Sequence, residues 1–315
     1  MKPTLAVILV IAAAAQAAVW VGHEGGLNQY SDEGEYVRNY DGYRRPISLA
    51  LDAARRRLWF LDGYDYSLVC FDVDGGRELF RVAEAAHAPG IGTSQLGLYV
   101  LEKRPIEPSI SLDAGDGAVW VADFYGHEVA KYDDAGNEVF RSASFHEPFA
   151  VAALGDCWAW VAGGTRTLSL VGPECETQRS MAGVNEGRAL AYDAARDLVW
   201  VADYGNNRVF AINREGRLKR KVTGVELPTN LAVDDARGTV WVARHYAGIV
   251  KISADKEEIT ASIPDPESVA AIDVDGAGRL WVAYNEAEEI ICYSPSGEKL
   301  LTIKRVKKPT GVAAE

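Results

Sequence analysis

The residues of this chain best suited to chemistry are its five histidines, because a neutral imidazole binds transition metals and exchanges protons near neutral pH. His23, His127 and His245 each come soon after a repeated tryptophan. Three imidazoles can hold Zn²⁺ and leave a fourth position open for water or substrate. The chain has no His-x-His or His-Glu-x-x-His pair, so these three meet only if the fold joins distant segments. We therefore predict no cofactor and keep a divalent metal on these residues as the alternative.

Covalent catalysis has no support in the sequence. It contains no Cys-x-x-Cys pair, no Ser-His-Asp order and no nucleophile elbow. The formal net charge of -12 argues against nucleic acid or an anionic membrane surface as the partner, because both require a cationic footprint. We therefore expect a protein, peptide or glycan as the partner rather than nucleic acid.

Residues 1–17 have the layout of a secretory signal peptide, with Lys2, an apolar run and small residues at Ala15 and Ala17. The apolar run is shorter than the roughly 20 residues that span a bilayer. We expect cleavage before Ala18 and a secreted or periplasmic protein without a membrane span in the mature chain. A retained N-terminal anchor is the alternative.

A tryptophan followed by small apolar residues recurs seven times and defines the organisation of the chain. The copies contain Trp20, Trp59, Trp120, Trp160, Trp200, Trp241 and Trp281, and from Trp120 onward their spacing is 40, 40, 41 and 40 residues. Apolar segments and turns with Gly or Asp, as at 72–76 and 133–137, surround the copies. Four short antiparallel strands per unit of about 40 residues are typical of a β-propeller blade.

The two ends of the chain predict how the ring closes. Residues 309–315 read PTGVAAE and match PTNLAVD at 228–234, which precedes a tryptophan copy. The first copy, after Ala18, lacks such a segment, and pairing the two leaves no open sheet edge at the seam. We therefore predict an all-β fold in which residues 18–315 form a single seven-bladed β-propeller of four-stranded antiparallel blades. The C-terminal strand pairs with the N-terminal blade to close the ring.

The copy at 200–212, WVADYGNNRVFAI, resembles the NHL repeat through Asp203, Asn207 and Arg208. The resemblance covers nearly all of the predicted mature chain at the level of blades and is strongest in this copy. It implies a propeller that serves as a platform for binding, lyase and hydrolase roles alike, so the fold alone does not choose a function.

The other copies depart from this pattern. After Trp120, His127 and Glu128 replace the Asn-Arg pair. The chain is also similar to seven-bladed streptogramin lyases, which use a metal with histidine and acidic residues, and to six-bladed amidating lyases, which hold zinc with histidine. Neither lyase site matches this sequence position by position, so neither activity is carried over.

One face of the predicted ring collects the polar candidates. We define the upper face by the loops between the second and third strands of each blade and the loops to the next blade; the lower face holds the other turns. All five histidines map to the upper face. The candidate binding residues are His23, Tyr64, Tyr125, His127, His146, Arg188, Tyr204, Asn230, Arg244, His245, Tyr246 and Tyr284. They suit a polar ligand or an acidic peptide over the channel mouth, and solvated loop side chains are the alternative.

An insertion at about 84–107 lengthens one connection on this face, and we expect it to cover part of the face as a flap. The lower-face turns, such as AARRR at 53–57, are expected to be solvated. Neither feature changes the blade count, because both lie between predicted strands.

The four cysteines divide into two pairs. Cys157 and Cys175 fall in two lower-face turns of one blade, where we predict a disulfide in an oxidising compartment. Two surface thiols too far apart to bond are the alternative, because the Cα atoms must approach within about 7 Å. Cys70 and Cys292 occupy equivalent third-strand positions and are expected to stay unpaired and buried.

Three functions fit these features. The first is a secreted or periplasmic interaction module that binds a protein, peptide or glycan on the upper face. The alternative is a metal-assisted lyase or hydrolase at the channel mouth, with His127 or His245 as metal ligand or general acid–base. The third is a structural propeller within a larger extracellular assembly. The lack of a compact catalytic motif in the sequence favours the first.

Overall fold

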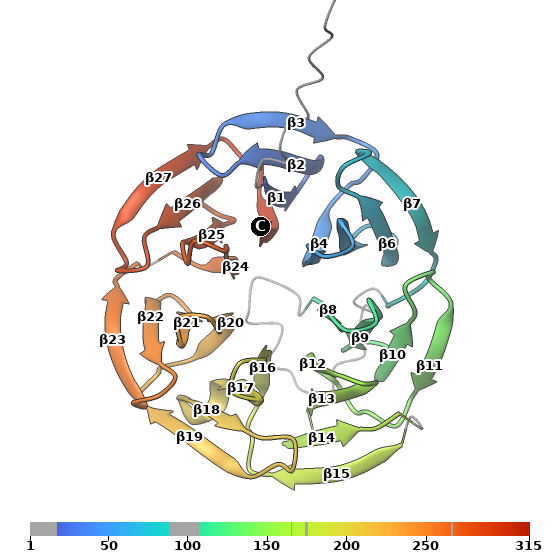
Figure 1. Ribbon diagram of the computed structural model, residues 1–315, viewed down its shortest axis with the longest axis vertical. Coiled ribbons are helices and arrows are strands. Elements are labelled where there is room, and N and C mark those ends of the chain that lie inside the picture. Colours follow the sequence, from blue (N-terminus) through green and yellow to red (C-terminus); the bar gives the residue numbers. More distant parts are fainter. Residues whose placement is uncertain (1–17, 88–106, 165, 174–175, 266) are drawn as a thin grey trace, which may run out of the picture.

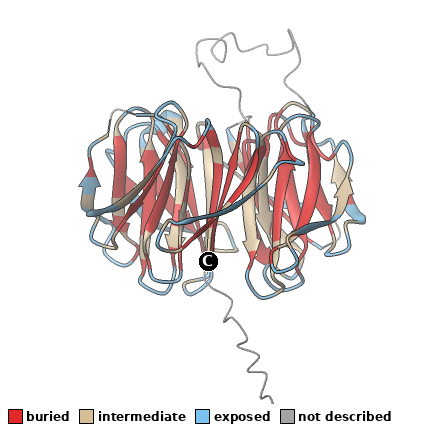
Figure 2. Ribbon diagram, turned by 90° about the horizontal axis from the view of Figure 1, so that it is seen from above, coloured by how far each residue is buried: buried red, intermediate tan, exposed pale blue. Residues whose placement is uncertain are grey.

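The computed structural model describes residues 18–87, 107–164, 166–173, 176–265 and 267–315. Seven four-stranded antiparallel sheets stand around a central channel (Figure 1). In side view the buried strands run between two layers of exposed loops, which are the upper and lower faces (Figure 2). The structure confirms the predicted all-β, seven-bladed propeller.

Each blade is ordered from an inner strand at the channel to an outer strand. Blade 1 contains β28 (Pro309–Ala314), β1 (Ala18–His23), β2 (Gly26–Ser31) and β3 (Tyr36–Tyr40), and blade 2 contains β4 (Pro46–Asp52), β5 (Arg57–Asp62), β6 (Ser67–Asp72) and β7 (Arg77–Val82). Blade 3 contains β8 (Ser109–Leu112), β9 (Val119–Asp123), β10 (Glu128–Tyr132) and β11 (Glu138–Ser142). Blade 4 contains β12 (Ala150–Gly155), β13 (Trp158–Gly163), β14 (Thr167–Val171) and β15 (Thr177–Ala182). Blade 5 contains β16 (Gly187–Asp193), β17 (Leu198–Asp203), β18 (Arg208–Ile212) and β19 (Leu218–Thr223). Blade 6 contains β20 (Pro228–Asp234), β21 (Thr239–Arg244), β22 (Gly248–Ser253) and β23 (Glu258–Ile263). Blade 7 contains β24 (Val269–Val274), β25 (Leu280–Tyr284), β26 (Glu289–Tyr293) and β27 (Lys299–Lys304). A short 3₁₀ turn, Tyr204–Asn206, precedes β18.

In the described part of the chain, no helix has the length and apolar character needed to cross a bilayer.

The ring closes as the two ends of the sequence predict. β28 pairs antiparallel with β1, so that Trp20 lies opposite Ala313 and Val21 lies opposite Val312. Gly22 lets β1 approach the next blade closely, because a Cβ at this position would lie 2.1 Å from the carbonyl oxygen of Pro46. Blade 1 is therefore built from both ends of the described chain.

The repeated tryptophans fill the wedges between blades. All seven are at most 1% exposed. Trp59 packs against Val119 and Val121 of blade 3, and the same contact recurs around the ring until Trp281 packs against blade 1. A large ring at one position of each blade therefore supplies the apolar contact that holds neighbouring sheets at the propeller angle. The extra tryptophan, Trp158, is only partly buried.

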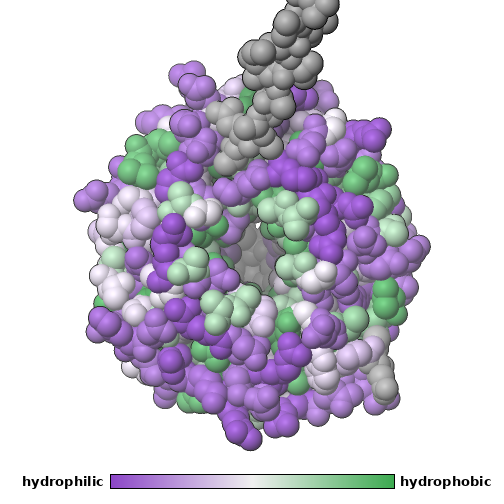
Figure 3. Space-filling view, viewed as in Figure 1, coloured by the Kyte–Doolittle hydropathy of each residue, from purple (hydrophilic) through white to green (hydrophobic). Residues whose placement is uncertain are grey.

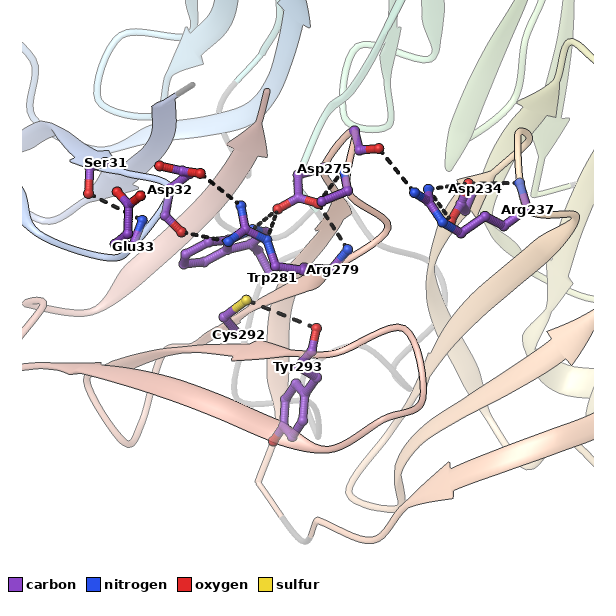
Figure 4. A network of polar contacts seen from close by, with 12 residues as sticks. Ser31, Asp32, Glu33, Asp234, Arg237, Asp275, Arg279, Trp281, Cys292 and Tyr293 are labelled. Carbon is purple, nitrogen blue, oxygen red and sulfur yellow. Dashed lines mark hydrogen bonds and ion pairs between the residues drawn. The ribbon is translucent and has the colours of Figure 1, made fainter. Parts of the chain in front are cut away.

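The lower-face turns are structural links rather than simply solvated loops. In blade 7 the Asp275 carboxylate accepts hydrogen bonds from Arg279 Nε at 2.7 Å and from the Trp281 indole N–H at 2.9 Å. Arg279 Nη1 then donates to the backbone carbonyl of Asp32 in blade 1 at 2.9 Å (Figure 4). Related Asp–Arg pairs contact the following blade at Asp52–Arg55, Asp193–Arg196 and Asp234–Arg237. The turn residues are largely exposed, as expected, and these arginines in addition bridge the blades.

Asp273 connects the last two inner strands of the ring. Its carboxylate accepts the backbone N–H of Ala314 in β28 at 2.8 Å and that of Val274 at 2.9 Å. Burial raises the pKa of Asp273 to about 6, although the two N–H groups stabilise the anion. The carboxylate is therefore bound at the closure of the ring but is costly to ionise there.

This shift predicts how pH acts on the closed ring. Because the folded pKa of Asp273 lies above its ordinary value of 3.8, the folded state binds this proton more tightly, and the group reduces stability as pH rises from about 4 to 6. Between pH 4 and pH 7 the wild type should lose up to about 3 kcal/mol relative to Asp273→Asn, which stays neutral. Urea unfolding of both proteins across this range measures the difference.

Asp133 provides the matched control. Hydrogen bonds from Asn137 lower the pKa of this exposed turn carboxylate, although its slight burial acts to raise it. Its contribution to stability is therefore present above its ordinary pKa and is lost in acid, so Asp133→Asn should show the opposite trend. A stability difference between wild type and Asp273→Asn that does not change with pH would contradict the role of Asp273.

Candidate functional site

All five histidines lie on the upper face, as the predicted topology requires. His23 ends β1, and His127 and His245 lie in the loops that connect the second and third strands of blades 3 and 6. His87 and His146 lie in the connections from β7 to β8 and from β11 to β12. The strand order of the blades brings these loops to one end of the ring.

A cavity of about 570 Å³ occupies the upper end of the central channel. Its wall is built by all seven blades. Figure 3 views the lower face, where the opposite end of the channel opens at the centre of the ring. Five of the predicted binding residues line it: Arg188, Asn230, Arg244, His245 and Tyr246. The structure therefore brings part of the candidate set together at the channel mouth.

One side of this cavity is a wall of aromatic and cationic groups from blades 5 and 6. The Arg188 guanidinium lies 4.0 Å from the ring centroid of Tyr204 and forms an ion pair with Glu186 at 3.0 Å. The Tyr204 hydroxyl lies 3.1 Å from His245 Nδ1, and the His245 and Tyr246 ring centroids are 4.3 Å apart. Each group holds its neighbour, so this side presents an ordered surface to a ligand.

Two further cations that line the cavity, Arg45 and Lys308, form ion pairs with carboxylates. Arg45 Nη1 lies 2.9 Å from Glu107 Oε1, and Lys308 Nζ lies 3.5 Å from Glu24 Oε1. Burial raises the pKa of Glu107, and the Arg45 charge opposes that shift. These charges are largely neutralised within the protein and leave little attraction for a ligand anion.

Arg244 differs from the other cations at the cavity. Its Nη2 donates to the backbone carbonyl of Ala247, its Nε is buried without an acceptor, and it forms no ion pair with any described carboxylate. It ends β21 three residues after Trp241, where blades 2, 3 and 5 carry Asp62, Asp123 and Asp203. Blade 6 therefore replaces a structural acid of the repeat with a guanidinium that lacks an anionic partner.

His127 has a structural role that the repeat explains. Its Nδ1 accepts the backbone N–H of Glu147 at 3.1 Å, in the connection to blade 4. Asn207 occupies the same position in blade 5, and its Oδ1 accepts the N–H of Leu227 at 2.9 Å. Both residues have a left-handed backbone, with φ of 57° and 50°. An acceptor at this position fastens the loop that leaves the blade.

The remaining candidates are dispersed. Tyr64 is 66% exposed and stacks with Arg44 outside the cavity lining. Tyr125 contacts Phe124, and His146 lies beside His127 with ring centroids 5.1 Å apart. His23 and Tyr284 are 8% and 1% exposed, so they offer a ligand almost no surface. Residues at equivalent sequence positions thus differ in access because the neighbouring loops cover some of them.

The three histidines kept as alternative metal ligands, His23, His127 and His245, do not converge. Among the described residues, one group of three His, Cys, Asp or Glu side chains has ligand atoms that all lie within 4.8 Å of one another. This group is His87, Asp123 and Glu128. None of His23, His127 and His245 is in this group. None of His87, Asp123 and Glu128 was among the sequence candidates for binding or metal ligation; the signal for Glu128 was the replacement of the Asn-Arg pair after Trp120.

The cysteines behave in part as expected. Cys70 and Cys292 are free and buried, and burial raises the pKa of both thiols to about 12, so they remain protonated. Cys157 Sγ lies 3.0 Å from Lys131 Nζ. Cys175 lies outside the described residues, so the disulfide stays a prediction. The signal peptide at 1–17 and most of the insertion at 84–107 also lie outside them.

Comparison with known proteins supports the fold and leaves the activity open. No family model and no curated protein matches the chain. Its structure is similar to a streptogramin B lyase (13% identity, 84% of this chain and 86% of that chain covered, TM-score 0.66). It is also similar to a catalytically inactive virginiamycin B lyase variant from Staphylococcus aureus with quinupristin (14%, 86% and 92%, 0.66) and to the WD40 repeats of RRP9 (10%, 86% and 84%, 0.67). At these identities the similarity shows the seven-bladed fold alone.

The role of His127 generates a test. His127→Asn should keep the free energy of unfolding within about 0.5 kcal/mol, because asparagine makes the same contact in blade 5. His127→Ala should lose about 1–2 kcal/mol, because it removes the acceptor and strains a left-handed position. Urea denaturation measures both, with His146→Ala as a control at an exposed imidazole. Equal losses for Asn and Ala at position 127 would contradict the structural role.

Proposed function

We propose that the protein is a binding module that holds a peptide segment of a partner protein over the upper mouth of its channel. A single carboxylate of that segment binds Arg244. The observation that carries this proposal is that the Arg244 guanidinium lines the cavity and forms no ion pair with any described carboxylate. A ligand carboxylate supplies the anionic partner that the described residues do not give this guanidinium, and a hydrogen bond between two charged groups is stronger than one between neutral groups.

The rest of the cavity supports a peptide ligand. About 570 Å³ is within the range of protein sites that enclose small ligands or short segments. Asn230, Asn285 and Thr229 bring amide and hydroxyl groups to the wall, and Tyr246 adds an aromatic surface. Backbone amides of a peptide can pair with such groups, while the carboxylate sets its orientation on Arg244.

The charge distribution favours one carboxylate over a polyanion. The protein carries a formal net charge of -12, and Glu24, Glu107 and Glu286 also line the cavity. A highly acidic segment is repelled by this field, whereas a neutral body with one anion is not. The most suitable ligand is therefore a polar segment with an isolated Asp, Glu or terminal carboxylate.

A lyase remains the second candidate, on one specific contact. Tyr204 and His245 lie at hydrogen-bond distance beside the cavity, and such a pair can exchange a proton with a bound substrate. Quinupristin, present with the similar virginiamycin B lyase variant, is a suitable probe. Conversion of quinupristin that disappears in His245→Ala, followed by liquid chromatography, would replace the binding proposal with the enzymatic one.

The expected site of action is outside the cytoplasm, on the basis of the signal-peptide pattern of residues 1–17. Expression of the whole sequence in a bacterium should release a chain that starts at Ala18. Mass spectrometry of the periplasmic and extracellular fractions measures this start. Recovery of an uncleaved chain in the membrane fraction would favour the retained anchor.

Removing the Arg244 charge tests the binding proposal. Short peptides with none, one or several carboxylates are titrated into the protein by calorimetry, and those with one should bind most tightly. Arg244→Gln should weaken this binding by about 10- to 100-fold, the value of a charged hydrogen bond. Lys256→Gln removes an equal charge from the lower face of the same blade and should leave the affinity unchanged.

Two results would refute the proposal. One is equal affinity for peptides whose carboxylates are blocked, because Arg244 would then have no anion to receive. The other is binding of neutral glycans but of no peptide, which would assign the cavity to a different ligand class. Circular dichroism of the Arg244→Gln protein checks that the loss of affinity is not a loss of fold.

A further inference from the structure

We propose that His87, Asp123 and Glu128 form a binding site for a divalent transition-metal ion on the upper face of blade 3. None of the three lines the central cavity, so this site is separate from the proposed peptide site and does not depend on it. Zinc is the probe ion because it accepts imidazole nitrogen and carboxylate oxygen together.

The three side chains already lie close to a coordinating arrangement. His87 Nδ1 is 2.6 Å from Asp123 Oδ2 and 3.8 Å from Glu128 Oε1, and one ligand atom from each residue lies within 4.8 Å of the others. Metal bonds of about 2.0–2.2 Å place neighbouring ligand atoms roughly 3–3.5 Å apart. Small side-chain movements therefore suffice, and the ion takes the place of the proton between His87 and Asp123.

Blade 5 shows what the same backbone does without a metal site. Asp203 ends β17 as Asp123 ends β9, and it accepts the backbone N–H of Asn185 at 2.7 Å. Asp123 accepts the backbone N–H of His87 in the same way at 2.9 Å. In both blades, therefore, an Asp carboxylate binds a backbone N–H of the loop that leads into the blade. Of these two loops, the one in blade 3 also places an imidazole, that of His87, beside the carboxylate.

The second difference between the blades is one of charge. Arg208, eight residues after Trp200, pairs with the Asp203 carboxylate at 2.5 Å. The corresponding residue of blade 3 is Glu128, so an acid stands where the repeat supplies a cation. The Asp123 and Glu128 side chains are 2% and 12% exposed, and two nearly buried carboxylates side by side require a positive charge.

The neighbouring arginine satisfies only part of this requirement. Arg141 contacts Glu128 Oε1, but its Nε also pairs with Glu138 at 2.9 Å. A bound divalent ion supplies the missing charge, and the His87 side chain, 57% exposed, gives it access from solvent. Gly126 keeps the position open, because a Cβ there would lie 2.2 Å from Asp123 Oδ2 and 2.4 Å from His87 Nδ1.

Zinc titration of the purified protein tests the site. After removal of metal with a chelator, competition against a chromogenic chelator should show one tightly bound Zn²⁺ per chain, and Co²⁺ should give a visible absorption band. His87→Ala should weaken Zn²⁺ binding by at least about 10- to 100-fold, the loss typical of changing even an outer partner of a metal ligand. His146→Ala, an exposed histidine on the same face, should not change it.

Two further variants separate metal binding from folding. Glu128→Arg recreates the Asp203–Arg208 pair of blade 5, so it should abolish Zn²⁺ binding while thermal unfolding stays cooperative. Arg141→Gln removes a competing cation and should tighten binding by about 3- to 10-fold. Absence of stoichiometric Zn²⁺ in the wild type, or equal affinity in wild type, His87→Ala and Glu128→Arg, would overturn the proposal.

Discussion

The antiparallel pairing of β28 with β1 is the constraint on which the rest of this structure depends. A β-sheet edge carries unpaired N–H and C=O groups, and without β28 the strand β1 would leave such an edge at the channel. Here Pro309–Ala314 supplies the inner strand of blade 1, and Asp273 binds the same strand from blade 7. Closure places all seven upper loops around one channel mouth, and this common end creates the cavity.

Within the closed ring, the repeat separates structural positions from variable ones. The tryptophan has the same packing in every blade, and lower-face arginines such as Arg279 connect neighbouring blades at several junctions. The position three residues after the tryptophan has no such uniformity. It is Asp203 in blade 5, where it accepts a backbone N–H from the preceding loop, and Arg244 in blade 6, where it lines the cavity and pairs with no described carboxylate. This position can vary because the tryptophan packing between the blades is the same with either residue.

Blade 3 illustrates the same principle through electrostatics. His127 retains the loop-fastening role of Asn207, so this exchange preserves structure although it introduces an imidazole. Glu128 reverses the charge of Arg208 beside a buried carboxylate, which is costly unless a cation compensates. Comparison of the blades therefore distinguishes His127, which replaces an asparagine, from His87, which lies beside two carboxylates. The number of histidines in the sequence does not make this distinction.

The sequence by itself determined the fold, because seven tryptophans, 39 to 41 residues apart except across the insertion between Trp59 and Trp120, and a terminal segment that matches 228–234 permit one closed arrangement of short strands. It also determined that the histidines share a face, because strand order assigns each loop to an end. Only the tertiary structure decided which of them meet. His23 is covered and His245 lines the cavity, and His87 reaches Asp123 across 36 residues of chain. Whether side chains meet depends on the paths of the loops and on burial by other blades. The spacing of the repeat in the sequence contains no information about either.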